Sequence, residues 1–87
     1  MTLPVTERGV IDLNDEDLEL AFARATILTK LCKENGIMPD EALVAVAVFM
    51  GRTFATDHED YVRQAIAGLN HLTWTTYQSH PKRGANG

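Results

Sequence analysis

The feature that most constrains this chain is a run of nine apolar residues, Ala42 to Met50, with the sequence ALVAVAVFM. The acidic segment Pro39-Asp40-Glu41 precedes the run and Gly51 follows it. A surface helix normally shows one apolar stripe, whereas a helix that is apolar all round needs neighbours on every side. The 87-residue chain offers only two other helical segments as neighbours. The sequence therefore predicts that a second copy of the protein covers this helix.

Length and charge limit the number of domains and the kinds of partner that this chain can have. A chain of 87 residues makes one domain and buries only about 60% of its unfolded surface, so association with a partner would stabilise it. Twelve acidic against eight basic side chains give a formal net charge of −4. This balance counts against generic binding to nucleic acids, because phosphate contacts need clustered Lys and Arg.

Cysteine usage and the N-terminal sequence indicate the compartment. Cys32 is the only cysteine, so no disulfide forms within one chain, and it has the character of a small buried hydrophobe in a reducing environment. The segment Met1-Thr2-Leu3-Pro4 has neither the basic region nor the apolar core of a signal peptide. The apolar run is also shorter than the roughly 20 residues that span a bilayer. We expect a cytoplasmic protein.

The two ends of the chain differ from its middle. Residues 1–13 carry Pro4 and Gly9 around short apolar pieces, which predicts an extended arm, either a short strand or a segment packed across a neighbouring subunit. The alternative is a frayed terminus. Residues 79–87 are polar and rich in Pro and Gly, which predicts a flexible tail. Residues 14–78 form the single helical domain.

The first predicted helix spans roughly residues 14–35. Asn14 is a good N-cap, and acidic residues crowd the start while Lys30 and Lys33 lie near the end, as the helix dipole favours. Asn35-Gly36 supplies a left-handed cap. Apolar residues form two stripes, which suggests contacts to two partners. The main stripe is Leu18, Ala21, Phe22, Ala25, Leu28 and Cys32, and the second is Leu20, Ala23, Ile27 and Leu31.

The second and third predicted helices span roughly residues 39–54 and 56–78. Pro39 suits the first position of a helix. Alternating valines in the apolar run raise a strand as an alternative, but the intervening alanines and the length favour a helix. Thr56 and Glu59 predict a capping box for the third helix. Its predicted inner face is Val62, Ala65, Ile66, Leu69, Thr73, and Thr76 or Tyr77.

These elements predict an all-α fold of three helices in which the apolar second helix is central. Since one self-complementary patch is enough for a two-fold interface, we expect a homodimeric helical bundle. The predicted interface also includes the second stripe of the first helix. The residues of the second helix that it buries are Leu43, Val44, Val46, Ala47, Val48 and Met50.

Residues that suggest chemistry have simpler structural explanations. His58 lies among Asp57, Glu59 and Asp60, but consecutive acids point in different directions and occupy a helix start, where carboxylates are stabilising. Cys32 lies on the main apolar stripe, which indicates a core position rather than a nucleophile. The glycines are isolated and form no phosphate-binding loop. We therefore predict no enzymatic activity, no cofactor and no metal, with an enzyme or metal protein built around His58 as the alternative.

Two groups of residues are candidates for contact with another protein. His71, Trp74 and Gln78 share a face of the third helix with Tyr77 beside it, and an exposed Trp is a common interface anchor. The alternative is a Trp half-buried against the bundle. The second group is the acidic start of the first helix, which would dock on a basic partner. Its members are Asp15, Glu16 and Glu19. The alternative is a solvated, well-capped helix start.

The predicted function is that of a small non-enzymatic interaction protein, acting as an adaptor, regulator or inhibitor of a larger protein. The alternative is a dimeric DNA-binding regulator that uses the third helix and the Lys82-Arg83 tail. That alternative is weakened by the acidic start of the third helix, because phosphates repel carboxylates.

Overall fold

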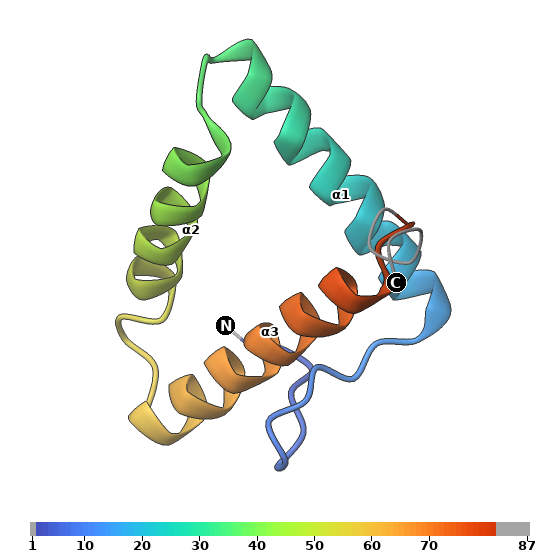
Figure 1. Ribbon diagram of the computed structural model, residues 1–87. Helices are drawn as coiled ribbons and strands as arrows, with labels where there is room; N and C mark the ends of the chain where they lie inside the picture. Colours follow the sequence, from blue (N-terminus) through green and yellow to red (C-terminus); the bar gives the residue numbers. More distant parts are fainter. Residues whose placement is uncertain (1, 82–87) are drawn as a thin grey trace. The chain divides into compact units, whose positions relative to one another are not determined.

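The computed structural model describes residues 2–81, and their regular structure is entirely helical (Figure 1). Helix α1 spans Asp15–Glu34, α2 spans Pro39–Thr53 and α3 spans Glu59–Ser79. No strand occurs among the described residues. The prediction of an all-α chain with three helices is confirmed. Most of the predicted tail, residues 82–87, and residue 1 lie outside the part of the chain that is described.

The chain divides into two compact units. One unit is Leu13–Thr56 and contains α1 and α2. The other is discontinuous in sequence, because it joins Met1–Asp12 to Asp57–Gly87. The N-terminal arm therefore belongs structurally with α3.

Both ends of α1 follow from local sequence signals. The side-chain Oδ1 of Asn14 accepts a hydrogen bond of 2.8 Å from the N–H of Asp17, which confirms the predicted N-cap. At the other end Gly36 has a φ of +67°, in the left-handed region that glycine adopts most readily. The N–H of Ile37 donates to the carbonyl of Cys32 at 2.9 Å, and that of Gly36 donates to Lys33 at 3.3 Å. These two bonds form the Schellman motif that satisfies the last carbonyls of a helix.

Helix α2 begins at Pro39, and the strand alternative for the apolar run is wrong. The carboxylate of Glu41 accepts a hydrogen bond of 2.9 Å from the N–H of Met38, which satisfies a donor at the helix start. Alanines between the valines allow the helical backbone despite the β-branched side chains. The helix ends at Thr53, one residue before the predicted end.

The unit of α1 and α2 has little internal core. Neither helix contains a buried residue. The two helices diverge from the turn that joins them, so each covers only part of the other (Figure 1). Partial cover is confined to Leu18, Ala21 and Cys32 on α1 and to Ala42, Met50 and Thr53 on α2. Cys32 was predicted to be a core residue, but it is only partly covered.

The N-terminal arm folds back on itself. Val5 and Ile11 form an antiparallel bridge. The N–H of Thr6 donates to the carbonyl of Val10 at 2.8 Å, and the N–H of Asp12 donates to Pro4 at 2.7 Å. The arm is thus a small loop closed by backbone hydrogen bonds.

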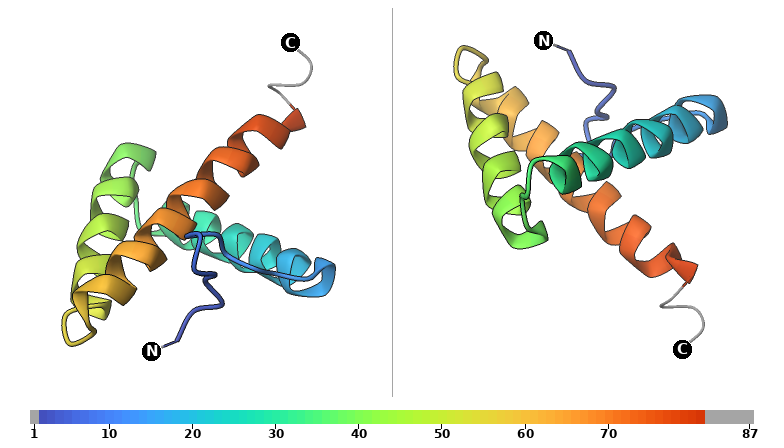
Figure 2. Two further views of the ribbon diagram at one scale, coloured as in Figure 1. Left: turned by 90° about the horizontal axis from the view of Figure 1, so that it is seen from below. Right: turned by 90° about the horizontal axis from the view of Figure 1, so that it is seen from above.

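This closed loop lies against α3 of the same chain (Figure 2). The N–H of Leu3 donates a hydrogen bond of 2.8 Å to the phenolic oxygen of Tyr61. The side chains of Val5 and Ile11 lie so close to Gly68 that a β-carbon there would be 3.0–3.1 Å from their atoms. A glycine in the middle of α3 therefore makes room for the arm.

The arm determines which side of α3 is covered. Ala65 is fully buried and Gly68 is buried beside it. The predicted inner face is wrong in part, because Ile66 and Tyr77 are 38% and 49% exposed. Val62, Ala65 and Leu69 of the predicted face are covered, whereas Thr73 and Thr76 are exposed. The covered side also extends to the neighbourhood of Gly68, against which the arm packs, and there it includes Tyr61, Leu72 and Thr75.

The start of α3 also differs from the prediction. The helix begins at Glu59 rather than near Thr56, and His58 is its N-cap. The turn that ends α2 continues through residues 54–56, with the N–H of Ala55 donating to the carbonyl of Arg52 at 3.3 Å. Thr56 is therefore part of the connecting turn. The helix ends at Ser79, one residue beyond the predicted end.

Candidate interaction site

The most distinctive surface feature of α3 is a pair of stacked aromatic rings. The rings of Trp74 and Tyr77 have centroids 5.3 Å apart and an interplanar angle of 30°. Trp74 is 56% exposed and Tyr77 is 49% exposed. By helical spacing the pair lies on the side of α3 away from Gly68 and the arm. Stacking against each other fixes the two rings while leaving much of their surface accessible.

The structure brings the four residues predicted for this site to the C-terminal half of one helix. His71 and Gln78 are exposed on α3 near the aromatic pair. Ile66 shares the side of the helix that carries Tyr77 and is 38% exposed. We call Ile66, Trp74 and Tyr77 the aromatic face.

A larger apolar surface covers the unit of α1 and α2. Twelve large apolar side chains of this unit are between 42% and 72% exposed, and we call them the α1–α2 apolar surface. They are Leu20, Phe22, Ile27, Leu28 and Leu31 on α1, Ile37 and Met38 in the turn, and Leu43, Val44, Val46, Val48 and Phe49 on α2.

This surface leaves much apolar area in contact with water. Twelve such side chains expose on the order of 1,000 Å² of apolar area in total, at about 100 Å² each. The side chains lie on several faces of the two helices, so this is a summed area and not the area of one contiguous patch.

Most residues predicted for a dimer interface belong to this surface. Leu43 is 72% exposed, Val44 is 67% exposed, and Val46 and Val48 are each 49% exposed. Ala47 is also exposed, whereas Met50 is partly covered. The second stripe of α1, with Leu20, Ile27 and Leu31, was predicted to join them and is exposed as well.

Sequence reasoning missed several members of the apolar surface. Phe22 and Leu28 were placed on the main stripe of α1, yet they are 50% and 60% exposed. Phe49 belongs to the nine-residue run but was not assigned to the interface, although it is 67% exposed. The sequence signal that could have identified Phe49 is that α2 is apolar on every side.

Charges on α1 separate along its length. Asp15, Glu16 and Glu19 are exposed near the N-terminus, and Lys30 and Lys33 are exposed near the C-terminus. Within the described residues, none of these side chains takes part in an ion pair. Glu34, the last residue of the helix, is exposed as well, so the start of α1 is acidic and its end carries charges of both signs.

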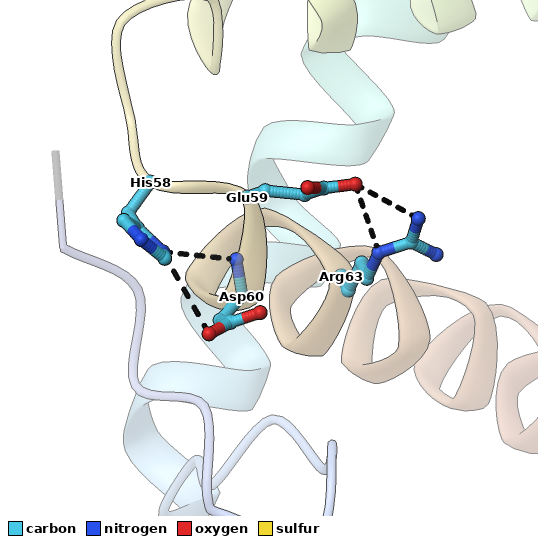
Figure 3. A network of polar contacts seen from close by, with 4 residues as sticks. All are labelled: His58, Glu59, Asp60 and Arg63. Atoms are coloured by element: carbon cyan, nitrogen blue, oxygen red, sulfur yellow. Dashed lines mark hydrogen bonds and ion pairs between the residues drawn. The ribbon is translucent and has the colours of Figure 1, made fainter.

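The cluster at residues 58–63 organises the start of α3 (Figure 3). The Nδ1 atom of His58 accepts a hydrogen bond of 3.2 Å from the N–H of Asp60. Glu59 forms an ion pair with Arg63 one turn later, with a shortest distance of 2.8 Å. All four side chains point outward and are 73–88% exposed. The cluster is the helix start that was predicted, although His58 and not Thr56 caps it.

Features that would support other functions are weak in this part of the chain. Among residues 2–81, no group of three or more His, Cys, Asp or Glu side chains converges as metal ligands do. A DNA-reading α3 would begin with two carboxylates, and its Arg63 is already paired with Glu59. Lys82 and Arg83, which that alternative also requires, lie outside the described residues.

Comparison with known proteins gives no relative, since no family model, no curated protein and no solved structure matches the chain. None of the helices in residues 2–81 combines the length and the apolar character needed to cross a bilayer.

Proposed function

We propose that this protein is a small cytoplasmic, non-enzymatic interaction module that associates with itself and binds a larger protein as an adaptor, regulator or inhibitor. The observation that carries the proposal is the α1–α2 apolar surface, on the order of 1,000 Å² on a unit without a buried helix residue. Leaving so much apolar area in water is unfavourable by about 25 cal/mol per Å². Association removes that area from water.

Self-association is supported by the large total apolar area that this unit leaves exposed. A standard interface buries about 800 Å² on each partner. A two-fold dimer uses the same patch twice, so part of the α1–α2 apolar surface forms it without a second kind of partner.

The aromatic face is the proposed contact for the larger protein. It belongs to the other structural unit and shares no residue with the α1–α2 apolar surface. Trp and Tyr are enriched among the residues that dominate binding energy at interfaces. Their stacked arrangement reduces the side-chain entropy that would be lost on binding.

Sedimentation equilibrium of the full chain over a wide concentration range tests the self-association. We expect a reversible dimer whose apparent mass rises with concentration. A mass that stays at 9.6 kDa over the whole range would refute this part of the proposal.

Replacing Trp74 by Ala tests the binding of a larger protein. After affinity purification from the native host with nuclease treatment, we expect one protein to co-purify in stoichiometric amount with the original chain. Because an aromatic anchor is worth about 2 kcal/mol or more, the Trp74→Ala variant should bind it about 30-fold more weakly. Isothermal calorimetry with the purified partner measures the difference.

The matched control is Gln64→Ala, since Gln64 is exposed on α3 away from the aromatic pair. Its affinity should equal that of the original chain. Equal affinity of the Trp74→Ala variant would exclude the aromatic face as the contact. Partners that disappear on nuclease treatment would favour the DNA-binding alternative instead.

A further inference from the structure

The aromatic pair of α3 presents ring surface that attracts positive charge. Trp74 is 56% exposed, and its ring lies 5.3 Å from that of Tyr77 at an interplanar angle of 30°. The face of an aromatic ring carries the negative part of its quadrupole. A cation within about 6 Å of the ring centroid is therefore attracted, and an indole attracts it most strongly.

Two side-chain amides flank Trp74 along the helix. Asn70 lies about one turn before it and Gln78 about one turn after it, at the four-residue spacing that brings side chains together on one face. Both are exposed, and within the described residues neither side chain takes part in a hydrogen bond. An amide oxygen is a hydrogen-bond acceptor. An N–H donor placed on the indole would thus find acceptors on either side.

This half of α3 has no charged side chains of its own. Residues 64–81 contain no Asp, Glu, Lys or Arg, and the last turn of the helix, which includes Tyr77, carries no basic residue. The carbonyl end of a helix has about half a negative charge and favours a cation nearby. The net charge of −4 attracts cations at longer range. A cation from another molecule would therefore meet no fixed positive charge on this part of α3.

We infer that the aromatic face binds an arginine side chain of the larger protein, with the guanidinium stacked on Trp74 and donating to the side-chain oxygen of Asn70 or Gln78. A guanidinium is planar, stacks on aromatic rings and carries five N–H donors, whereas the ammonium of lysine is compact and strongly hydrated. A proline or leucine would cover the rings but would use neither amide. The inference rests on the proposed binding of a larger protein and specifies the chemistry of that contact.

A matched pair of peptides tests this chemistry on the full chain. The probes are acetyl-Gly-Arg-Gly-amide and its citrulline counterpart, in which a neutral urea of nearly the same shape replaces the guanidinium. Trp74 is the only tryptophan, so its indole N–H gives one NMR signal that reports on the site. At pH 7.5 and low salt, we expect the arginine peptide to shift this signal saturably. The citrulline peptide should bind at least about threefold more weakly.

A substitution beside the indole tests where the guanidinium lies. Gln78→Glu places a carboxylate there with little change in size, so the arginine peptide should bind about threefold more tightly, and less so at high salt. The matched control is Gln64→Glu, which adds the same charge at an exposed position about 20 Å earlier on α3. We expect the control to bind the peptide as the original chain does.

Trp74→Leu tests the contribution of the ring, because leucine keeps an apolar side chain but has no aromatic face. Backbone amide signals of α3 report binding in this variant. We expect it to lose the difference in affinity between the arginine and citrulline peptides. Far-UV circular dichroism checks that each variant keeps its helices, as expected for exposed positions.

Three results would overturn the inference. The arginine peptide leaves the indole signal unchanged, the two peptides bind equally, or Gln64→Glu strengthens binding as much as Gln78→Glu does. The chain's own Lys82 and Arg83 are the other candidate occupants. In the full chain with Lys82→Gln and Arg83→Gln, an unchanged indole signal supports a separate partner. A shifted signal together with tighter peptide binding would give the site to the chain's own basic pair instead.

Failure of this inference can be distinguished from failure of the proposed function. If Trp74→Ala weakens binding of the purified larger protein but the two peptides bind equally, the aromatic face remains the contact and its preference for a cation is wrong. If Trp74→Ala leaves that affinity unchanged while the arginine peptide still binds selectively, the proposed contact is wrong and the arginine site stands.

Discussion

Leu43→Asp is expected to convert the self-associated protein into a monomer that keeps its helices. Leu43 is 72% exposed in a single chain, so aspartate there costs the isolated fold little. In a two-fold interface the substitution occurs twice and buries two unpaired carboxylates. At about 2–5 kcal/mol for each unpaired charge, dimerisation should weaken at least a thousandfold. Sedimentation equilibrium and far-UV circular dichroism measure mass and helix content together.

Gln64→Asp provides the matched control for this prediction. Gln64 is exposed on α3, a helix that contributes no residue to the α1–α2 apolar surface. The substitution adds the same charge at an exposed helix position, so the dimer affinity should stay within a few-fold of the original. A dimer that survives Leu43→Asp unchanged would place the interface elsewhere. Loss of helix in that variant would mean that Leu43 is needed within one chain.

Gly68→Val is expected to displace the N-terminal arm from α3. A β-carbon at Gly68 would lie 3.0 Å from Cδ1 of Ile11 and 3.1 Å from Cγ2 of Val5. Carbon atoms prefer about 3.5–4.0 Å, and valine adds two methyl groups at this position. Overpacking of this kind typically lowers the free energy of unfolding by about 1–3 kcal/mol. Denaturant unfolding measures the loss, and faster trypsin cleavage after the exposed Arg8 reports release of the arm.

Gly51→Ala is the control, because nothing apart from the adjoining backbone of α2 lies within 4 Å of the β-carbon that it adds. Removing a glycine from a helix should raise the free energy of unfolding by about 0.5–1 kcal/mol. The two substitutions thus change stability in opposite directions. Unchanged stability and unchanged cleavage at Arg8 in Gly68→Val would show that the arm does not depend on this contact.

Elements whose signals lie within a few residues could be predicted from the sequence. Asn14 caps α1 and Gly36 ends it, because each acts on backbone groups no more than a turn away. Pro39 and Glu41 start α2 in the same way. The helical state of the apolar run also followed from its alanines, although valines alternate along it.

Features that depend on distant contacts could not be predicted. The covered face of α3 is determined by Val5 and Ile11, which lie far away in the sequence and pack on Gly68. Periodicity alone placed Ile66 inside, because an apolar residue on a helix does not reveal where a glycine admits another segment. The start of α3 was predicted too early because the turn after α2 includes Thr56.

The candidate surfaces were predicted in part for a related reason. The apolar run indicated that the chain has too few neighbouring helices to cover α2, and Leu43 and Val44 are exposed. The two apolar stripes of α1 were also recognised. The sequence does not tell which of them is shielded from solvent within this unit. Phe22 and Leu28 were therefore assigned to the covered side, and both are exposed.

The discontinuous unit of arm and α3 has a consequence for synthesis of the chain. The arm is made first, but Tyr61 and Gly68, against which it packs, are made only after the whole of α1 and α2. At about 5–20 residues per second, the arm waits several seconds for its partner. During that interval α1 and α2 leave the ribosome with their apolar side chains uncovered. Neighbouring ribosomes on one message would then hold two such nascent chains close together, before the last helix of either has emerged.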